Sequence, residues 1–161
     1  MPLITVDGIR PDPFVMLADD AALPPDGGAM VSLPRFCKDR DALLARNAPI
    51  GVRLKAEESP ELLGDDVHRL SVVALEFPKF RDGRAFSWAR LLRTRLRFTG
   101  EIRAVGDFLY DQIAYQHRVG FTSWEVAEDF GIADLRRALS EISNVYQPSA
   151  DGRKTIRELR L

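Results

Sequence analysis

The run Leu70–Phe77 is the feature of this 161-residue chain that most constrains its fold. Its letters, LSVVALEF, are almost all apolar and include two adjacent β-branched valines. A strand that is packed on both faces needs such a run, because neither face meets water. We therefore expect Leu70–Phe77 to be a central strand of a mostly parallel sheet that helices cover.

Short apolar runs alternate with helical segments from residue 29 onward, which is typical of parallel sheets with crossover helices. The expected strands are Ala29–Leu33, Ile50–Leu54, Leu70–Phe77, Glu101–Val105 and Phe121–Trp124. The expected helices span residues 38–47, 57–64, 85–98, 107–119, 125–130 and 132–143. A complete eight-unit barrel takes about 250 residues. We therefore predict an α/β fold of about five βα units, arranged as a mostly parallel open sheet or as a half-barrel.

The first 28 residues differ from the rest in charge and in turn content. They hold five acids against one base, and five of the ten prolines. Leu3–Val6 and Phe14–Leu17 are predicted short strands, and Asp7-Gly8 supplies turn residues. We expect a small N-terminal hairpin or edge extension, then a βα core at 29–143 and a tail at 144–161, all within a single domain.

Composition and residue spacing exclude several classes of protein. One cysteine and two histidines without metal-ligand spacing give no basis for a metal site, and no nucleotide-binding glycine motif is present. We therefore expect neither a metal nor a cofactor. No apolar run approaches the ~20 residues of a membrane helix, and the first residues do not resemble a secretory signal. We expect a cytoplasmic protein without membrane contact.

The net charge of −1 hides an uneven distribution of charged residues. Residues 79–103 hold eight bases against two acids, a local charge of +6, so the remainder of the chain sums to −7. Seven of these bases are arginines, whose guanidinium groups bind carboxylate, phosphate or sulfate oxygens in a bidentate way. The segment therefore indicates a small oxyanion or an acidic partner surface as its ligand.

The predicted helix 85–98 separates its arginines into two groups. The face opposite the apolar stripe, expected in solvent, holds Arg90, Arg93 and Arg97. Arg95 falls within the apolar stripe, where a charge must be paired or must line a cleft. We therefore expect Arg95 to pair with an acid such as Glu76 or Glu101, or to belong to a binding site.

Ligands of parallel α/β folds bind beyond the carboxyl ends of the strands. The loop after Leu70–Phe77 combines acids, bases and aromatic residues, and the loop after Glu101–Val105 holds Asp107, a predicted helix N-cap. Gln112 lies within the apolar arc of the next helix, where its amide needs a partner, either a ligand or a neighbouring carbonyl. The candidate ligand-binding residues are Glu76, Lys79, Asp82, Arg84, Arg95, Arg103, Asp107 and Gln112.

Two other patterns give alternative hypotheses. Cys37 lies near a predicted helix N-terminus beside basic residues, which favours a thiolate, but no histidine or second cysteine is placed to assist catalysis. Residues 122–139 have the spacing of a helix-turn-helix, with Ala127 and Gly131 four residues apart. The first helix of that motif would be acidic and would repel phosphates, so nucleic-acid binding is disfavoured.

A resemblance to a known family lies in residues 75–121, which read LEFPKFRDGRAFSWARLLRTRLRFTGEIRAVGDFLYDQIAYQHRVGF. In order, they contain F-x-x-F-x-D-G-R, S-x-A-R-x-L-R-x-R, G-E-x-R-A-x-G-D, D-Q and G-F. This order resembles the core signature of a bacterial family named domain of unknown function 934. The signature positions in this chain are Phe77, Phe80, Asp82, Gly83, Arg84, Ser87, Arg90, Arg93, Arg95, Glu101, Arg103, Gly106, Asp107, Asp111 and Gln112.

The resemblance implies a role in sulfite reduction, because genes of this family tend to lie beside assimilatory sulfite reductase. We expect an accessory or regulatory component that binds an oxyanion or an acidic partner, such as sulfite reductase or a related sulfur-assimilation protein. A strict oxidoreductase would need a bound organic cofactor, for which the sequence has no fingerprint. The alternatives are the helix-turn-helix regulator and a homo-oligomeric scaffold that pairs the solvent-facing arginines with the acidic N-terminal segment of another copy.

Overall fold

The strands form one eight-stranded sheet in the computed structural model, which describes residues 1–160. The order of the strands across the sheet is β2-β1-β8-β7-β6-β5-β4-β3. Their bounds are β1 Leu3–Thr5, β2 Gly8–Arg10, β3 Phe14–Met16, β4 Gly28–Ser32, β5 Ile50–Leu54, β6 Val72–Phe77, β7 Glu101–Gly106 and β8 Ser123–Glu125. Strands β3 to β8 are parallel, whereas β1 runs antiparallel to both β8 and β2.

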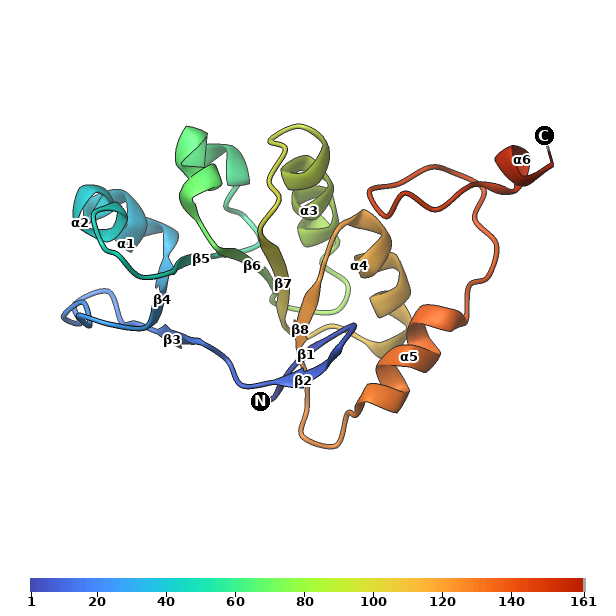
Figure 1. Cartoon of the computed structure of the whole chain (residues 1–161), viewed down its shortest axis with the longest axis horizontal. Coiled ribbons are helices and arrows are strands. Elements are labelled where there is room, and N and C mark those ends of the chain that lie inside the picture. The colour runs from blue at the N-terminus through green and yellow to red at the C-terminus, as the bar shows by residue number, and fades with distance from the viewer. Residues whose placement is uncertain (161) are drawn as a thin grey trace.

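The parallel strands stand side by side in chain order, so every crossover moves by one strand in the same direction. Crossovers of one hand then place the helices on one face of the sheet, as Figure 1 shows. Residues 11–13 alone join the two outermost strands, β2 and β3, so the sheet curls toward closure. The predicted α/β fold with a mostly parallel sheet is confirmed, and of the two predicted arrangements the structure has the half-barrel.

The helices are short, and all but α6, which lies apart near the C-terminus, cover the outside of this half-barrel (Figure 1). Their bounds are α1 Leu33–Lys38, α2 Arg40–Leu44, α3 Arg84–Thr94, α4 Ile113–Val119, α5 Ile132–Ser140 and α6 Ile156–Leu159, with 3₁₀ helices η1 Pro60–Arg69 and η2 Tyr110–Gln112. The count of five βα units is not confirmed, because the segment after β5 is the 3₁₀ helix η1. Within residues 1–160, none of the helices combines the length and the apolar content needed to span a bilayer.

Side chains along each strand alternate between the two faces of the sheet. The face that the helices cover contains the main apolar core, to which β6 and β7 contribute Val73, Leu75, Phe77, Ile102 and Ala104. The opposite, concave face has a small apolar set made of Met30, Val72, Ala74 and Val105, with Phe14 packed against it. The inward positions of β5 to β8 also carry polar and charged side chains, among them Arg53, Arg103 and Glu125.

Strand β7 ends at Gly106, where the chain geometry requires glycine. Its φ is +98°, and a Cβ atom there would lie 2.4 Å from the carbonyl oxygen of Phe77 on β6. The backbone N–H of Asp107 donates to the same oxygen at 2.7 Å. The loop after β7 is therefore held close against the end of β6, at the carboxyl edge of the sheet.

Residues 123–125 form a strand, so the predicted helix at 125–130 is wrong. Strand β8 pairs with β7 on one side and with β1 on the other. Trp124 is fully buried in the helix-covered core, and its indole N–H donates to the Oε1 of Gln116 at 2.8 Å. The helix-turn-helix lacks its first helix, because the burial of this indole holds the segment in the sheet.

The two predicted N-terminal strands are present as β1 and β3. Strand β1 forms a hairpin with Gly8–Arg10, and Phe14–Met16 extends the opposite edge of the sheet beside β4. Two local predictions need correction. The helix predicted from residue 107 starts only at Tyr110 as η2, so Asp107 is not its N-cap. Cys37 lies in the last turn of α1 and not near a helix N-terminus, because the helix begins five residues earlier than predicted, at Leu33.

Candidate functional site

Charged side chains gather on the concave face of the half-barrel. We call the group the Arg103 cluster, and it consists of Asp12, Arg53, Glu76, Glu101, Arg103 and Glu125. Five of them occupy inward positions of four adjacent parallel strands, β5 to β8, and Asp12 lies in the linker between β2 and β3. The curl of the sheet brings these positions together.

Arg103 lies at the centre of the cluster and is only 1% exposed. Its Nη1 donates to Asp12 Oδ2 at 2.6 Å and, more weakly, to Glu125 Oε1 at 3.5 Å. Its Nε donates to Glu101 Oε1 at 2.9 Å. Its Nη2 is buried and has no hydrogen-bond partner within residues 1–160. One donor of a buried guanidinium is therefore available, and an unsatisfied buried donor is uncommon in proteins.

The electrostatics of the cluster keep Arg103 charged. Burial lowers the pKa of the Arg103 guanidinium, but the hydrogen bond to Asp12 and the charge of Glu101 offset this, so the pKa lies above its ordinary value. Beside it, Arg53 Nε donates to Glu76 Oε2 at 3.1 Å. The cluster therefore holds two guanidinium groups and four carboxylates.

A small cavity of about 80 Å³ lies within the concave face. Arg53 and Arg103 both line it, together with Asp12, Glu125 and apolar side chains that include Phe14. The Arg103 guanidinium carbon lies 5.7 Å from the centre of the Phe14 ring. The volume suits one small ion or a few water molecules, and it is far below the roughly 300 to 1,000 Å³ of pockets for larger ligands.

Asp12 reaches this cavity from the short linker that crosses between the two edges of the sheet. Pro11 and Pro13 flank it, and each proline restricts the backbone of the linker. One Asp12 oxygen accepts a hydrogen bond from the Phe14 N–H at 3.0 Å, and the other binds Arg103. The acidic N-terminal segment thus pairs with the basic segment of the same chain.

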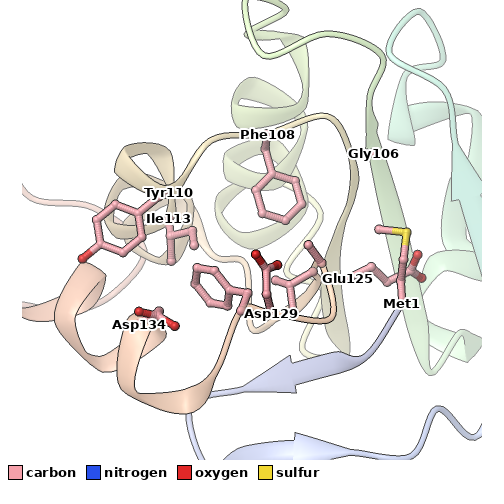
Figure 2. Close-up of a pocket in the computed structure, with 11 residues that line it drawn as sticks. Met1, Gly106, Phe108, Tyr110, Ile113, Glu125, Asp129 and Asp134 are labelled. Atoms are coloured by element: carbon pink, nitrogen blue, oxygen red, sulfur yellow. The ribbon is translucent and has the colours of Figure 1, made fainter.

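A second, larger cavity opens at the carboxyl ends of β7 and β8, and its volume is about 580 Å³ (Figure 2). We call it the β7–β8 cavity. It lies between the loop after β7, the loop after β8 and α5, and its wall shares Glu125 with the small cavity. Its lining residues are Met1, Gly106, Phe108, Tyr110, Ile113, Glu125, Val126, Ala127, Asp129, Phe130 and Asp134.

Of the eight candidates from the sequence, the structure brings two, Glu76 and Arg103, into the Arg103 cluster. Asp82 and Arg84 pair with each other in the loop after β6, with Arg84 Nη2 donating to Asp82 Oδ2 at 2.6 Å. This hydrogen bond lowers the pKa of Asp82 to about 2. Lys79 is exposed in the same loop. The loop and the cluster are separate places in the molecule.

The expected burial of Arg95 is wrong. Its side chain is 73% exposed and pairs with Glu61 at 3.1 Å, because α3 ends at Thr94 and residue 95 leaves the apolar stripe. Asp107 is exposed in the loop after β7. Gln112 is half-buried, and its Nε2 donates to the carbonyl of Phe80 at 2.8 Å, so the predicted bond to a neighbouring carbonyl is confirmed.

Arg93 is half-buried, and its guanidinium is bonded within the chain instead of lying free in solvent as expected. Its guanidinium donates to the carbonyl oxygens of Phe98 and Gly100, each at 2.7 Å, and to that of Gly120 at 2.9 and 3.1 Å. Burial lowers its pKa. The scaffold interpretation therefore loses one of its three arginines, because these donors are already used within the chain.

The candidate residues from the sequence leave out four members of the Arg103 cluster, namely Asp12, Arg53, Glu101 and Glu125. Arg53 and Glu125 are charged residues within strands that are otherwise mostly apolar. This pattern could have identified them, because a charged side chain on such a strand faces away from the apolar core, which in a curled sheet is the inward face. The same alternation places Glu101 and Arg103 on one face of β7. No comparable signal marks Asp12, whose place depends on the closing of the sheet.

The fold and the site define a class of α/β half-barrel with a buried, charged concave face. The family model for bacterial proteins of unknown function, DUF934, matches residues 51–157, which is more than half of the chain. The chain therefore belongs to this family, and the resemblance seen in its sequence is confirmed. No curated protein and no solved structure matches the chain.

Proposed function

We propose that this chain is a cytoplasmic accessory or regulatory component of sulfite reduction that binds a small oxyanion at the Arg103 cluster. The observation that carries the proposal is the buried Nη2 of Arg103, which has no partner within residues 1–160 and belongs to a side chain that lines a cavity of about 80 Å³. Arg53 lines the same cavity. Guanidinium donors that converge on a space of this size suit a sulfite or sulfate ion.

The charge of the cluster determines how an anion can enter. An added oxyanion meets two carboxylates in the wall of the small cavity, Asp12 and Glu125, so it must take the place of one of them. Asp12 is the acid that can leave, because it lies in a linker whereas Glu101 and Glu125 are held on strands. It is also the most exposed of the three acids on Arg103, at 35%. An oxyanion in its place would receive the same Nη1 hydrogen bond as well as that of Nη2.

Calorimetry with sulfite, sulfate and chloride at constant ionic strength tests this exchange. We expect sulfite or sulfate to bind and chloride not to bind. Asp12→Asn should tighten oxyanion binding about tenfold, because the neutral amide no longer competes for Arg103. Arg53→Gln should weaken binding. The matched control is Asp7→Asn, which removes an exposed acid that pairs with Arg10 at 2.8 Å.

Absence of sulfite and sulfate binding to both the wild type and Asp12→Asn would exclude the oxyanion site. The pathway is tested separately in a deletion strain of the source bacterium, which should grow poorly with sulfate and normally with cysteine as the sulfur source. Unchanged sulfite reduction in that strain would refute the pathway assignment. Copurification with sulfite reductase from cells grown on sulfate would support a partner role.

A further inference from the structure

The β7–β8 cavity is not used by the proposed oxyanion site, apart from the wall that Glu125 shares. Three of its lining residues are carboxylates, Glu125, Asp129 and Asp134, and none of the eleven carries a basic side chain. Its volume of about 580 Å³ lies within the range of small-molecule sites. Its position at the carboxyl ends of parallel strands is where ligands of such sheets bind.

We infer that the β7–β8 cavity binds a small organic cation, with the ammonium group near Asp129 and Asp134 and the apolar part against the aromatic wall. The inference does not rest on the proposed function, because it stands on different residues and on the opposite ligand charge. An anion would be repelled by Asp129 and Asp134, since neither forms an ion pair with a basic side chain within residues 1–160.

Asp129 is the carboxylate most available to a ligand. Asp134 Oδ2 already accepts a hydrogen bond from the Gly131 N–H at 3.0 Å. Glu125 Oε1 already accepts a weak hydrogen bond from Arg103 Nη1 at 3.5 Å. Asp129 has no hydrogen bond or ion pair to the described part of the chain, residues 1–160. In Figure 2 its carboxylate points toward Phe108, into the space between the loops. A cation there would gain an ionic hydrogen bond without displacing a partner.

Aromatic rings supply the second part of the recognition. Tyr110 and Phe130 lie with ring centres 6.4 Å apart and tilted by 54°, and both line the cavity. The Tyr110 hydroxyl donates to Glu141 Oε1 at 2.8 Å, which fixes the ring. Phe108, on the other side, packs against Phe77 of the core at 5.8 Å. Rings held in this way offer faces and edges to an ammonium group and its carbon chain.

Three probes of nearly equal shape and different charge test the inference, namely phenethylammonium, 2-phenylethanol and 3-phenylpropanoate. Binding is measured by calorimetry and by ligand-observed NMR at neutral pH and low salt. We expect the ammonium probe to bind at least about fivefold more tightly than the alcohol, and the carboxylate probe to bind most weakly. Asp129→Asn should abolish the preference for the ammonium probe.

The matched control is Glu128→Gln, which removes the neighbouring exposed acid that is not among the lining residues. It should leave the preference unchanged, and circular dichroism should show that both variants are folded. Three results would each overturn the inference: no binding of the ammonium probe up to about 10 mM, equal or tighter binding of the carboxylate probe, or an unchanged preference in Asp129→Asn. Sulfite binding to the same samples reports independently on the oxyanion site.

Discussion

The two faces of the curled sheet differ in what they bury. The helix-covered face packs apolar side chains against apolar side chains, and Leu75, Ile102 and Trp124 are all fully or almost fully buried there. The concave face buries Arg103 among carboxylates instead. Because burying charge is costly and apolar residues of similar volume are often at least as stabilising, the concave face is the one whose composition points to function.

Three arginines of one basic segment show the same contrast in detail. Arg95 pairs with Glu61 in solvent, Arg93 donates to backbone carbonyls of the segments before β7 and β8, and Arg103 holds the carboxylates of the concave face. Sequence proximity and shared charge therefore do not imply a shared role. Substitutions at these arginines should therefore have separate effects on stability and binding.

Arg103→Met should destabilise the protein by about 3–5 kcal/mol, because the change removes a fully buried guanidinium and leaves three partly buried carboxylates without their shared countercharge. The free energy of unfolding in urea measures it. The control, Arg95→Met, breaks an exposed pair and should cost less than about 1 kcal/mol. Equal losses for the two variants would mean that the concave cluster is no more coupled to folding than a surface pair.

Gly106→Ala should cost about 2–3 kcal/mol, because the positive φ is strained for alanine and the new Cβ would meet the Phe77 carbonyl at 2.4 Å. This substitution tests how closely the end of β7 approaches β6 at the carboxyl edge of the sheet, where the two faces meet. Gly152→Ala is the matched control, since it also has a positive φ but has open space around its Cβ. A chemical denaturation midpoint equal to that of the control would contradict the close approach of β7 to β6.

Arg93→Met should cost about 1–3 kcal/mol, because three partly buried carbonyl groups lose their donors. Arg93→Met should leave oxyanion binding unchanged, because Arg93 does not line the small cavity as Arg103 does. Arg90→Met, on the exposed side of α3, should change the free energy of unfolding by no more than about 0.5 kcal/mol. A loss of oxyanion binding in Arg93→Met would show that the two faces are not independent.

The smallest effect is expected at Asp82, which lies in the loop after β6 and on neither face of the sheet. It shows how an exposed ion pair behaves, for comparison with the two faces. Its carboxyl should titrate at about 2, below the ordinary value of 3.8, because Arg84 donates hydrogen bonds to it. A lowered native pKa contributes stability above the ordinary pKa, and the contribution is lost as the pH falls toward 2. In a titration followed by carbon NMR, the midpoint of the Asp82 carboxyl should rise to near 3.8 in Arg84→Gln. It should not change in Arg81→Gln. A wild-type midpoint near 3.8 would mean that the Asp82–Arg84 pair does not form in solution.

Much of the fold could be predicted from local pattern. The apolar run ending at Phe77 specified the strand between β5 and β7, and the alternation of strands and helices specified the parallel order. The strand predicted at Phe121–Trp124 is present as Ser123–Glu125, with shifted bounds. The helix predicted at 125–130 is absent, because a segment this short has too few positions to separate a helical period from a period of two. The burial of Trp124, which depends on residues far along the chain, holds the segment in the sheet.

Less of the site could be predicted. Glu76 and Arg103 were found because charged residues inside or at the end of apolar strands are conspicuous. Arg53 pairs with Glu76 of the neighbouring strand β6, and that contact depends on the register of two strands, which no local pattern specifies. Asp12 meets Arg103 across 91 positions of sequence, and only closure of the sheet creates that contact. Long-range pairing of this kind has no local signal.

A crystal structure of Asp12→Asn with selenite, a sulfite analogue with an anomalous signal, tests the central claim most directly. We predict a selenium peak in the concave cavity, with its oxygens in hydrogen-bond contact with Nη2 of Arg103 and with the Arg53 guanidinium. Peaks only beside exposed arginines such as Arg84 or Arg97, with the cavity closed around Arg103, would contradict the account.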